Sequence, residues 1–167
     1  NDEKSDKTIG WPKTWEVRGE IYQAIFQSKD ESIKSLSDDP LTIALDSYKK
    51  ALDLDEGNKF GKSIKIKLTL LTNDLTNQAV EAFNNEDFNK ALESFEQIME
   101  INNLAVVKED NPDAVDTVIV FNAGLAAYNA KDYNKAIKYY GEAAKYGYNG
   151  PRTYSLIANS YQLKNDT

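Results

Sequence analysis

The clearest feature of the chain is a hydrophobic pattern with helical spacing. Between residues 88 and 101, apolar side chains recur at intervals of three or four, and polar side chains fall on the opposite face. The apolar set is Ala91, Leu92, Phe95, Ile98 and Met99, and the polar set is Glu93, Glu96, Gln97 and Glu100. This spacing is typical of an amphipathic helix and differs from the alternation of a strand. The segment therefore predicts a helix with one buried face.

A longer helix is predicted immediately upstream, from about Phe60 to Asn84. Its apolar residues keep the same spacing throughout: Phe60, Ile64, Leu68, Leu71, Leu75, Ala79 and Phe83. Because nothing interrupts the period, we expect one continuous helix over the whole range.

An internal repeat links two parts of the chain. Residues 82–92 and 127–137 align without gaps, so that Asp87-Phe88-Asn89-Lys90-Ala91-Leu92 returns 45 positions later as Asp132-Tyr133-Asn134-Lys135-Ala136-Ile137. A second match relates residues 128–132 to residues 162–166, 34 positions later. Self-similarity at such a period indicates an architecture of stacked helical units.

Residues 120–128 and 132–143 together resemble one tetratricopeptide repeat, a pair of helices in a family with a period of about 34 residues. The resemblance implies an all-α fold, a right-handed superhelix of about three helix pairs plus a C-terminal helix. It also implies that Gly124 lets the first helix approach the second closely, with Ala136 and Ala143 as small residues on the second helix. Tyr133 and Tyr140 are then expected to fill the gaps between helices.

The same register places the other repeats. We expect a polar leader over residues 1–13 and a repeat domain over residues 14–167, with repeats at about 14–55, 60–103, 114–148 and, in part, 151–167. The first repeat departs from the family pattern through a longer loop at about 27–40. Additional residues near 103–113 explain why the first offset is 45 positions and not 34.

Composition narrows the possible functions. The net charge is −7, from 20 Lys and Arg against 27 Asp and Glu, which disfavours a nucleic-acid partner. Cysteine and histidine are absent, which removes thiol chemistry and the commonest general base and metal ligand. No apolar stretch reaches the roughly 18 residues that a membrane span requires. We expect no enzyme activity, no cofactor and no metal site.

Acidic residues are the remaining candidates for chemistry. Asp53, Asp55 and Glu56 resemble part of a calcium loop, but the glycine comes one position early and the closing glutamate is missing. We therefore assign them to the end of a helix. A glycosidase-like carboxylate pair stays open, because separation in space decides it.

The resemblance implies that the first helices of the repeats line a concave groove that binds a peptide or protein segment. The groove residues that it assigns are Asn73, Thr76, Phe121, Asn122, Tyr128, Asn129, Arg152 and Asn159. Phe121 and Tyr128 have an alternative role in packing between helices. Asn122 and Arg152 resemble parts of a carboxylate clamp, but Thr76, Val80 and Leu156 occupy its other basic positions, which disfavours a receptor for chaperone tails.

Three functions follow from these observations. The leading hypothesis is a scaffold that binds a protein or peptide partner in the groove. The second is self-association, including a homodimer, through a C-terminal helix whose Tyr154, Ile157, Ala158 and Tyr161 form an uncovered face. The third is a small-molecule binder or enzyme that uses acidic residues. The polar start and the Asn-, Lys- and Asp-rich composition indicate a bacterial periplasmic or cell-envelope location, with the cytoplasm as the alternative.

Overall fold

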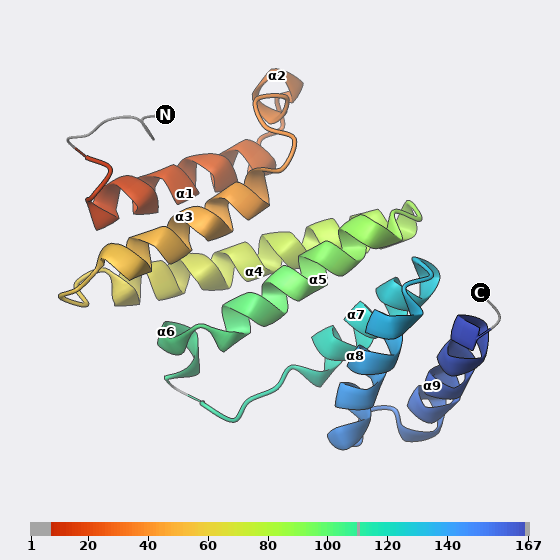
Figure 1. Ribbon diagram of the computed structural model, residues 1–167. Helices are drawn as coiled ribbons and strands as arrows, with labels where there is room; N and C mark the ends of the chain where they lie inside the picture. The colour runs from red at the N-terminus through yellow and green to blue at the C-terminus, as the bar shows by residue number, and fades with distance from the viewer. Residues whose placement is uncertain (1–7, 110, 166–167) are drawn as a thin grey trace. The chain divides into compact units, whose positions relative to one another are not determined.

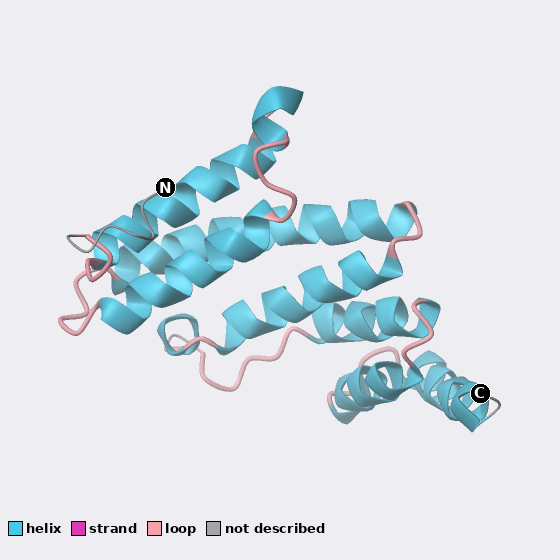
Figure 2. Ribbon diagram, turned by 45° about the horizontal axis from the view of Figure 1, so that its top comes forward, coloured by secondary structure: helices cyan, strands magenta, loops and turns pink. Residues whose placement is uncertain are grey.

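The structure is a computed structural model that describes residues 8–109 and 111–165. Every regular element in these ranges is an α-helix (Figures 1 and 2). The helices are α1 (Pro12–Gln27), α2 (Glu31–Lys34), α3 (Pro40–Leu54), α4 (Gly61–Asn84), α5 (Phe88–Asn103), α6 (Ala105–Lys108), α7 (Thr117–Asn129), α8 (Tyr133–Lys145) and α9 (Gly150–Asn165). The predicted all-α class is confirmed for the described residues, and the handedness of the superhelix stays a prediction.

The helix ends differ in detail from the expected boundaries. Helix α1 begins at Pro12, inside the expected leader of residues 1–13, because proline is favoured in the first turn of a helix. The expected loop at 27–40 contains α2, and the expected additional segment at 103–113 contains α6. Residues 1–7, Asp110, Asp166 and Thr167, on which parts of the expected leader, additional segment and last repeat fall, lie outside the described residues.

The described residues form two compact units. The first runs to Asp74 and includes Ala105–Val107, and the second holds Leu75–Leu104 and the residues from Lys108 onward. Helix α4 is continuous, as predicted, and contributes its first part to one unit and its last turns to the other.

In the first unit, α1 and α3 pack as a pair through a glycine and a tyrosine. The ring of Tyr48 lies so close to Gly19 that no β-carbon fits between them. Tyr48 is fully buried, and its hydroxyl donates a hydrogen bond to Gln23 Oε1 at 3.0 Å. The small residue on α1 therefore sets how closely α3 approaches it.

Two buried carboxylates connect α1 to α4 in this unit. Glu16 accepts hydrogen bonds from Lys67 Nζ at 2.6 Å and from Ser63 Oγ at 2.5 Å, and Lys13 Nζ lies 2.7 Å from its other oxygen. Asp74 Oδ2 accepts hydrogen bonds from the side-chain amides of Gln23 and Gln27 at 2.5 and 2.8 Å. These hydrogen bonds compensate each carboxylate for the loss of hydration on burial, so polar side chains can hold α1 against α4 at these two points.

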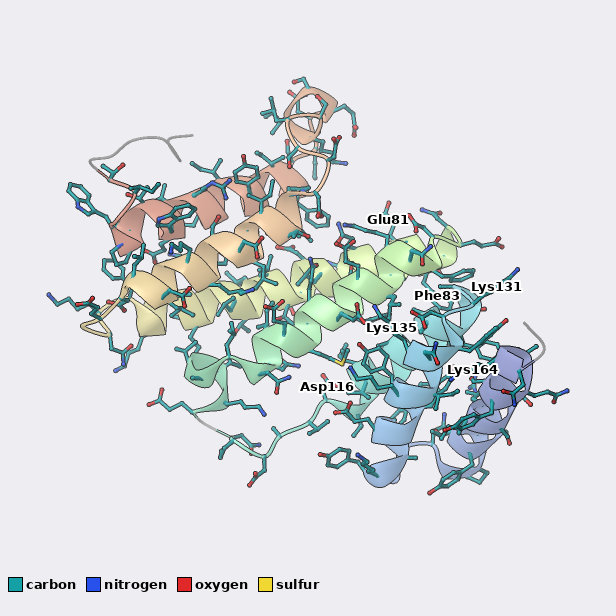
Figure 3. All side chains as sticks on the ribbon, in the orientation of Figure 1. Glu81, Phe83, Asp116, Lys131, Lys135 and Lys164 are labelled. Carbon is teal, nitrogen blue, oxygen red and sulfur yellow. The ribbon has the colours of Figure 1, made fainter. Side chains whose placement is uncertain are left out.

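The second unit contains two hairpin turns of the same design, one between the last turns of α4 and α5 and one between α7 and α8. Each turn has a non-glycine residue in the left-handed region, Glu86 at φ 61° and Lys131 at φ 63°. The next residue, Asp87 or Asp132, caps the second helix by accepting a hydrogen bond from the backbone N–H three residues later. Figure 3 labels Lys131 in the second of these turns.

Aromatic pairs close both hairpins. The rings of Phe83 and Phe88 meet edge-on at 5.1 Å, and those of Tyr128 and Tyr133 meet edge-on at 6.0 Å. These pairs are also 45 positions apart, so the repeat in the sequence corresponds to a repeat of contacts. The expectation that Tyr133 fills a gap between helices agrees with this packing.

Helix α8 lies between α7 and α9, with contacts to both. Toward α7 it buries Tyr140, whose ring lies against Gly124. Toward α5 it directs Lys135 and Tyr139, and both side chains donate hydrogen bonds to Glu96 (Figure 3 labels Lys135). Thr153 and Ser160 of α9 are buried.

Candidate functional site

In the second unit, the last turns of α4 and the helix α7 each carry the same pattern of asparagine, aliphatic residue and asparagine on one face. On α4 these are Asn77, Val80 and Asn84, and on α7, 45 positions later, they are Asn122, Leu125 and Asn129. We call these six residues the Asn face. The spacing of three and four residues places each set on one side of its helix.

The Asn face is open to solvent. Asn77 and Asn84 are exposed, Val80 is 52% exposed, and the three residues on α7 are partly exposed. An exposed aliphatic side chain between two amides adds apolar contact area to a polar surface. Such a surface offers both kinds of interaction to a partner.

The amides of the Asn face have unused hydrogen-bonding capacity. Asn129 Nδ2 donates a hydrogen bond to Leu125 O at 2.8 Å, so part of its capacity is used within α7. Within the described residues, the side chains of Asn84 and Asn122 have no hydrogen-bond partner. Each can donate two hydrogen bonds and accept two, which matches the N–H and C=O groups of a peptide main chain.

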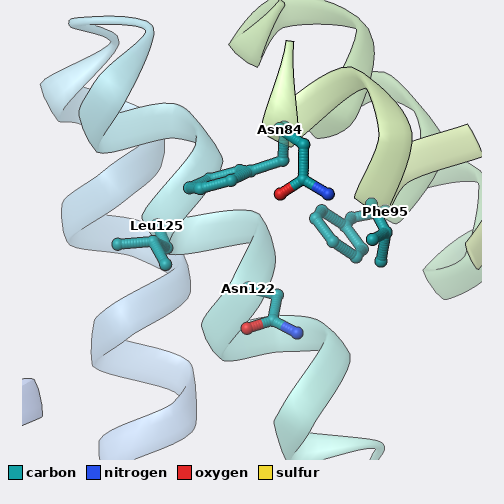
Figure 4. A pocket seen from close by; sticks show the side chains of 6 residues that line it. Asn84, Phe95, Asn122 and Leu125 are labelled. Atoms are coloured by element: carbon teal, nitrogen blue, oxygen red, sulfur yellow. The ribbon is translucent and has the colours of Figure 1, made fainter. Parts of the chain in front are cut away.

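A pocket of about 150 Å³ opens at this face. Four of its six lining residues belong to the Asn face, namely Val80, Asn84, Asn122 and Leu125, and Phe83 and Phe95 complete it. Figure 4 shows the side chains of Asn84, Phe95, Asn122 and Leu125 around the pocket. None of the lining residues carries a charge or titrates, so the pocket is suited to apolar groups.

The structure separates the residues that the sequence assigned to the groove. Asn122 and Asn129 lie on the Asn face, and Asn122 lines the pocket. Asn73 is exposed on α4 but belongs to the first unit, and Thr76 is partly buried on the same helix. Asn159 is exposed on α9.

Two aromatic residues in that set pack against other rings. Phe121 is only 5% exposed, and its ring lies 5.4 Å from that of Tyr140 and 5.2 Å from that of Tyr148. The assignment of Phe121 to an exposed groove is therefore corrected, since burial in the core removes it from the surface. Tyr128 is partly exposed and packs on Tyr133. The guanidinium of Arg152 lies 5.9 Å from the centre of the Phe121 ring.

Sequence reasoning missed four members of the Asn face: Asn77, Val80, Asn84 and Leu125. The 45-residue offset could have identified them as pairs, because Asn77 aligns with Asn122 and Val80 with Leu125. Leu125 was missed because α7 is apolar on nearly every side, so that its exposed face does not stand out in the sequence.

The acidic residues show structural roles. Asp55 Oδ1 and Oδ2 accept hydrogen bonds from the backbone N–H groups of Lys59 and Phe60 at 3.0 and 2.7 Å, in the loop that leads to α4. Across residues 8–109 and 111–165, no three acidic side chains are grouped so that they could hold a metal ion. In the same ranges, none of the helices has the length and hydrophobicity that a bilayer span requires.

Comparison with known proteins identifies the hairpin that carries half of the Asn face. Residues 119–146 match the family model of the tetratricopeptide repeat, and this range covers α7 from Ile119 and the whole of α8. This match supports the resemblance to the tetratricopeptide family that the sequence repeat indicated. No curated protein matches the chain.

The tetratricopeptide repeat indicates a module for protein–protein interaction. In this chain its first helix, α7, presents Asn122, Leu125 and Asn129, and its second helix covers the other side of α7 through Tyr140. The α4–α5 hairpin repeats the turn, cap and aromatic contacts of this unit. The partners expected of the chain are therefore proteins.

Proposed function

We propose that the protein is a scaffold that binds a peptide segment of a partner protein in a groove, with the Asn face as contact surface. The observation that carries this proposal is the repetition of the asparagine–aliphatic–asparagine pattern on two helices, with Asn84 and Asn122 unpaired. Two unpaired amides beside exposed aliphatic side chains match a peptide, whose main chain is polar and whose side chains supply apolar area.

The proposal assigns no catalytic role to the chain. The pocket at the Asn face is lined by hydrocarbon and amide side chains, and neither kind is a general acid or base. A bacterial cell-envelope location stays a prediction from composition.

Selection of linear peptides from a random displayed library on the immobilised protein tests this function. Selected peptides are then titrated against a double variant, Asn84→Ala with Asn122→Ala. We expect the affinity to fall about tenfold or more, because both main-chain contacts are lost.

The matched control is Asn89→Ala with Asn134→Ala, an exposed pair at equivalent positions near the start of α5 and α8. These variants should bind like the parent. If no peptide is selected, or if both double variants weaken binding equally, the Asn face is not the binding surface.

A second candidate is self-assembly through α9. Tyr154 and Tyr161 are 62% and 51% exposed, and Ala158 between them is exposed as well. Their counterparts 34 positions earlier on α7 are Val120, Gly124 and Ala127, which are buried. This face of α9 is open where that of α7 is covered, so it is available to a second copy of the chain.

A further inference from the structure

The pocket at the Asn face has the size of one amino-acid side chain. Its volume is about 150 Å³, and a cavity of about that volume lined by Leu, Ile and Phe holds a benzene molecule. Val80, Phe83, Phe95 and Leu125 supply hydrocarbon walls from three helices, α4, α5 and α7. A leucine or phenylalanine side chain matches this space, whereas an alanine methyl group would leave most of it empty.

Two asparagine amides line the pocket beside these hydrocarbon walls. Asn84 ends α4 and Asn122 lies on α7, and both line the pocket (Figure 4). Because neither amide has a partner among the described residues, each is available to a backbone N–H or C=O. An anchor side chain in the pocket would bring its own peptide groups next to these amides.

We propose that this pocket is the anchor site for one uncharged side chain, of leucine to phenylalanine size, in an extended segment of a partner protein. Asn84 and Asn122 hydrogen-bond the main chain on the two sides of that residue. This inference rests on the proposed function of the Asn face and adds the chemistry of the ligand to it.

The charge of the site supports this occupant. No lining residue is charged, so a lysine or glutamate in the pocket would lose its hydration without an opposite charge to compensate. Binding that depends on apolar contact and neutral amides changes little with ionic strength. We expect the dissociation constant to change less than about twofold between about 0.05 and 0.5 M salt.

The first experiment uses N-acetyl-leucinamide as the probe, titrated into the labelled protein and followed by NMR. We expect saturable shifts of the side-chain amide signals of Asn84 and Asn122. N-acetyl-alaninamide at the same concentrations should give at most small shifts. Equal shifts with both probes, or shifts with neither, would overturn the anchor assignment.

A filled-pocket variant provides the second readout. In Val80→Phe a ring is added at an exposed position that lines the pocket, so the fold is retained while the space is occupied. Val118→Phe is the matched control, because Val118 is 47% exposed on α7 and does not line the pocket. The probe should bind the control and lose about tenfold or more in affinity for Val80→Phe.

The outcomes for the pocket and for the Asn face can be told apart with a library-selected peptide. If Val80→Phe leaves its affinity unchanged while the Asn84 and Asn122 double variant weakens it, the Asn face binds peptides and the anchor inference is wrong. If the probe binds as expected but no peptide is selected, the pocket assignment stands for an apolar group and the peptide-binding function fails.

Discussion

The ring of Tyr140 lies so close to Gly124 that a β-carbon on residue 124 would be 2.7 Å from the ring atom Cδ1. Tyr140 is fully buried, and its ring also packs against that of Phe121 at 5.4 Å, so the ring has little room to move. Gly19 and Tyr48 have the same relationship in the first unit. Glycine and tyrosine therefore fix the spacing within one helix pair of each unit.

The first prediction concerns this close contact. We expect Gly124→Ala to lower the free energy of unfolding by about 1–3 kcal/mol, because overpacking outweighs the gain in helix propensity. Gly141→Ala on α8 is the control, since nothing lies within 4 Å of its β-carbon position. The control should be stabilised by about 0.5–1 kcal/mol. Urea denaturation measures both, and stabilisation of both would contradict the close contact.

The second prediction separates the two fully buried tyrosines, Tyr48 and Tyr140. The hydroxyl of Tyr140 has no hydrogen-bond partner among the described residues, whereas that of Tyr48 donates to Gln23. Tyr140→Phe should therefore be neutral or stabilising, because it removes an unsatisfied polar group. Tyr48→Phe should cost about 1–2 kcal/mol, because it leaves the Gln23 oxygen without its donor. Thermal unfolding measures the stability of both variants. A larger loss of stability in Tyr140→Phe than in Tyr48→Phe would contradict this prediction.

The third prediction concerns the acid sensitivity of Glu16. Burial by itself would raise the pKa of this carboxyl group, but hydrogen bonds from Lys13, Lys67 and Ser63 lower the pKa from 4.5 to about 2. Since the pKa in the folded state is the lower one, the stabilisation is complete above about pH 4.5 and is lost as the pH falls toward about 2.

We therefore expect Glu16→Gln to lower the free energy of unfolding at neutral pH by about 1–3 kcal/mol. The difference in free energy of unfolding between the parent and this variant should become smaller below about pH 4.5, as measured by urea titrations. Glu31→Gln is the control, because its side chain is 84% exposed and pairs with Lys34 at the surface. If this difference in free energy of unfolding stays constant from neutral to acidic pH, the charge of Glu16 is not the source of the stabilisation.

Much of the helical framework could be predicted from the sequence because it depends on local spacing. The repeated Asp-aromatic-Asn-Lys phrase marks the starts of α5 and α8, and the period of apolar residues marks α4 over its full length. The family resemblance also implied that Gly124 allows close approach of two helices and that Tyr140 fills a gap between helices, and the structure brings these two residues together. Each of these features is determined within one helix or between two helices that are adjacent in the sequence.

The candidate site and the buried carboxylates were harder to predict because they depend on contacts between distant segments. Glu16 meets Ser63 and Lys67, and Asp74 meets Gln23, across about fifty positions of sequence, and no periodic pattern marks such pairs. The family resemblance assigned Phe121 to the groove, and the sequence could not correct this because α7 has apolar residues on most sides. Which of them faces solvent is decided by the helices packed around α7.

The last prediction tests whether α9 mediates self-assembly. Its exposed tyrosines, Tyr154 and Tyr161, are two turns apart on one side of the helix, with Ala158 between them. A second copy that covers this face would bury two aromatic rings, each with about 150–250 Å² of surface. We expect the mass of the parent, measured by light scattering, to rise with concentration toward that of a dimer.

Tyr161→Glu should prevent this rise, because a carboxylate without a partner is costly to bury in an apolar contact. The control is Tyr146→Glu, at a tyrosine that is 56% exposed and follows α8, so that it is not part of α9. It should associate like the parent. A parent that stays monomeric at every concentration would exclude self-assembly through α9, and the Asn face would then be the surface on which partners should be sought.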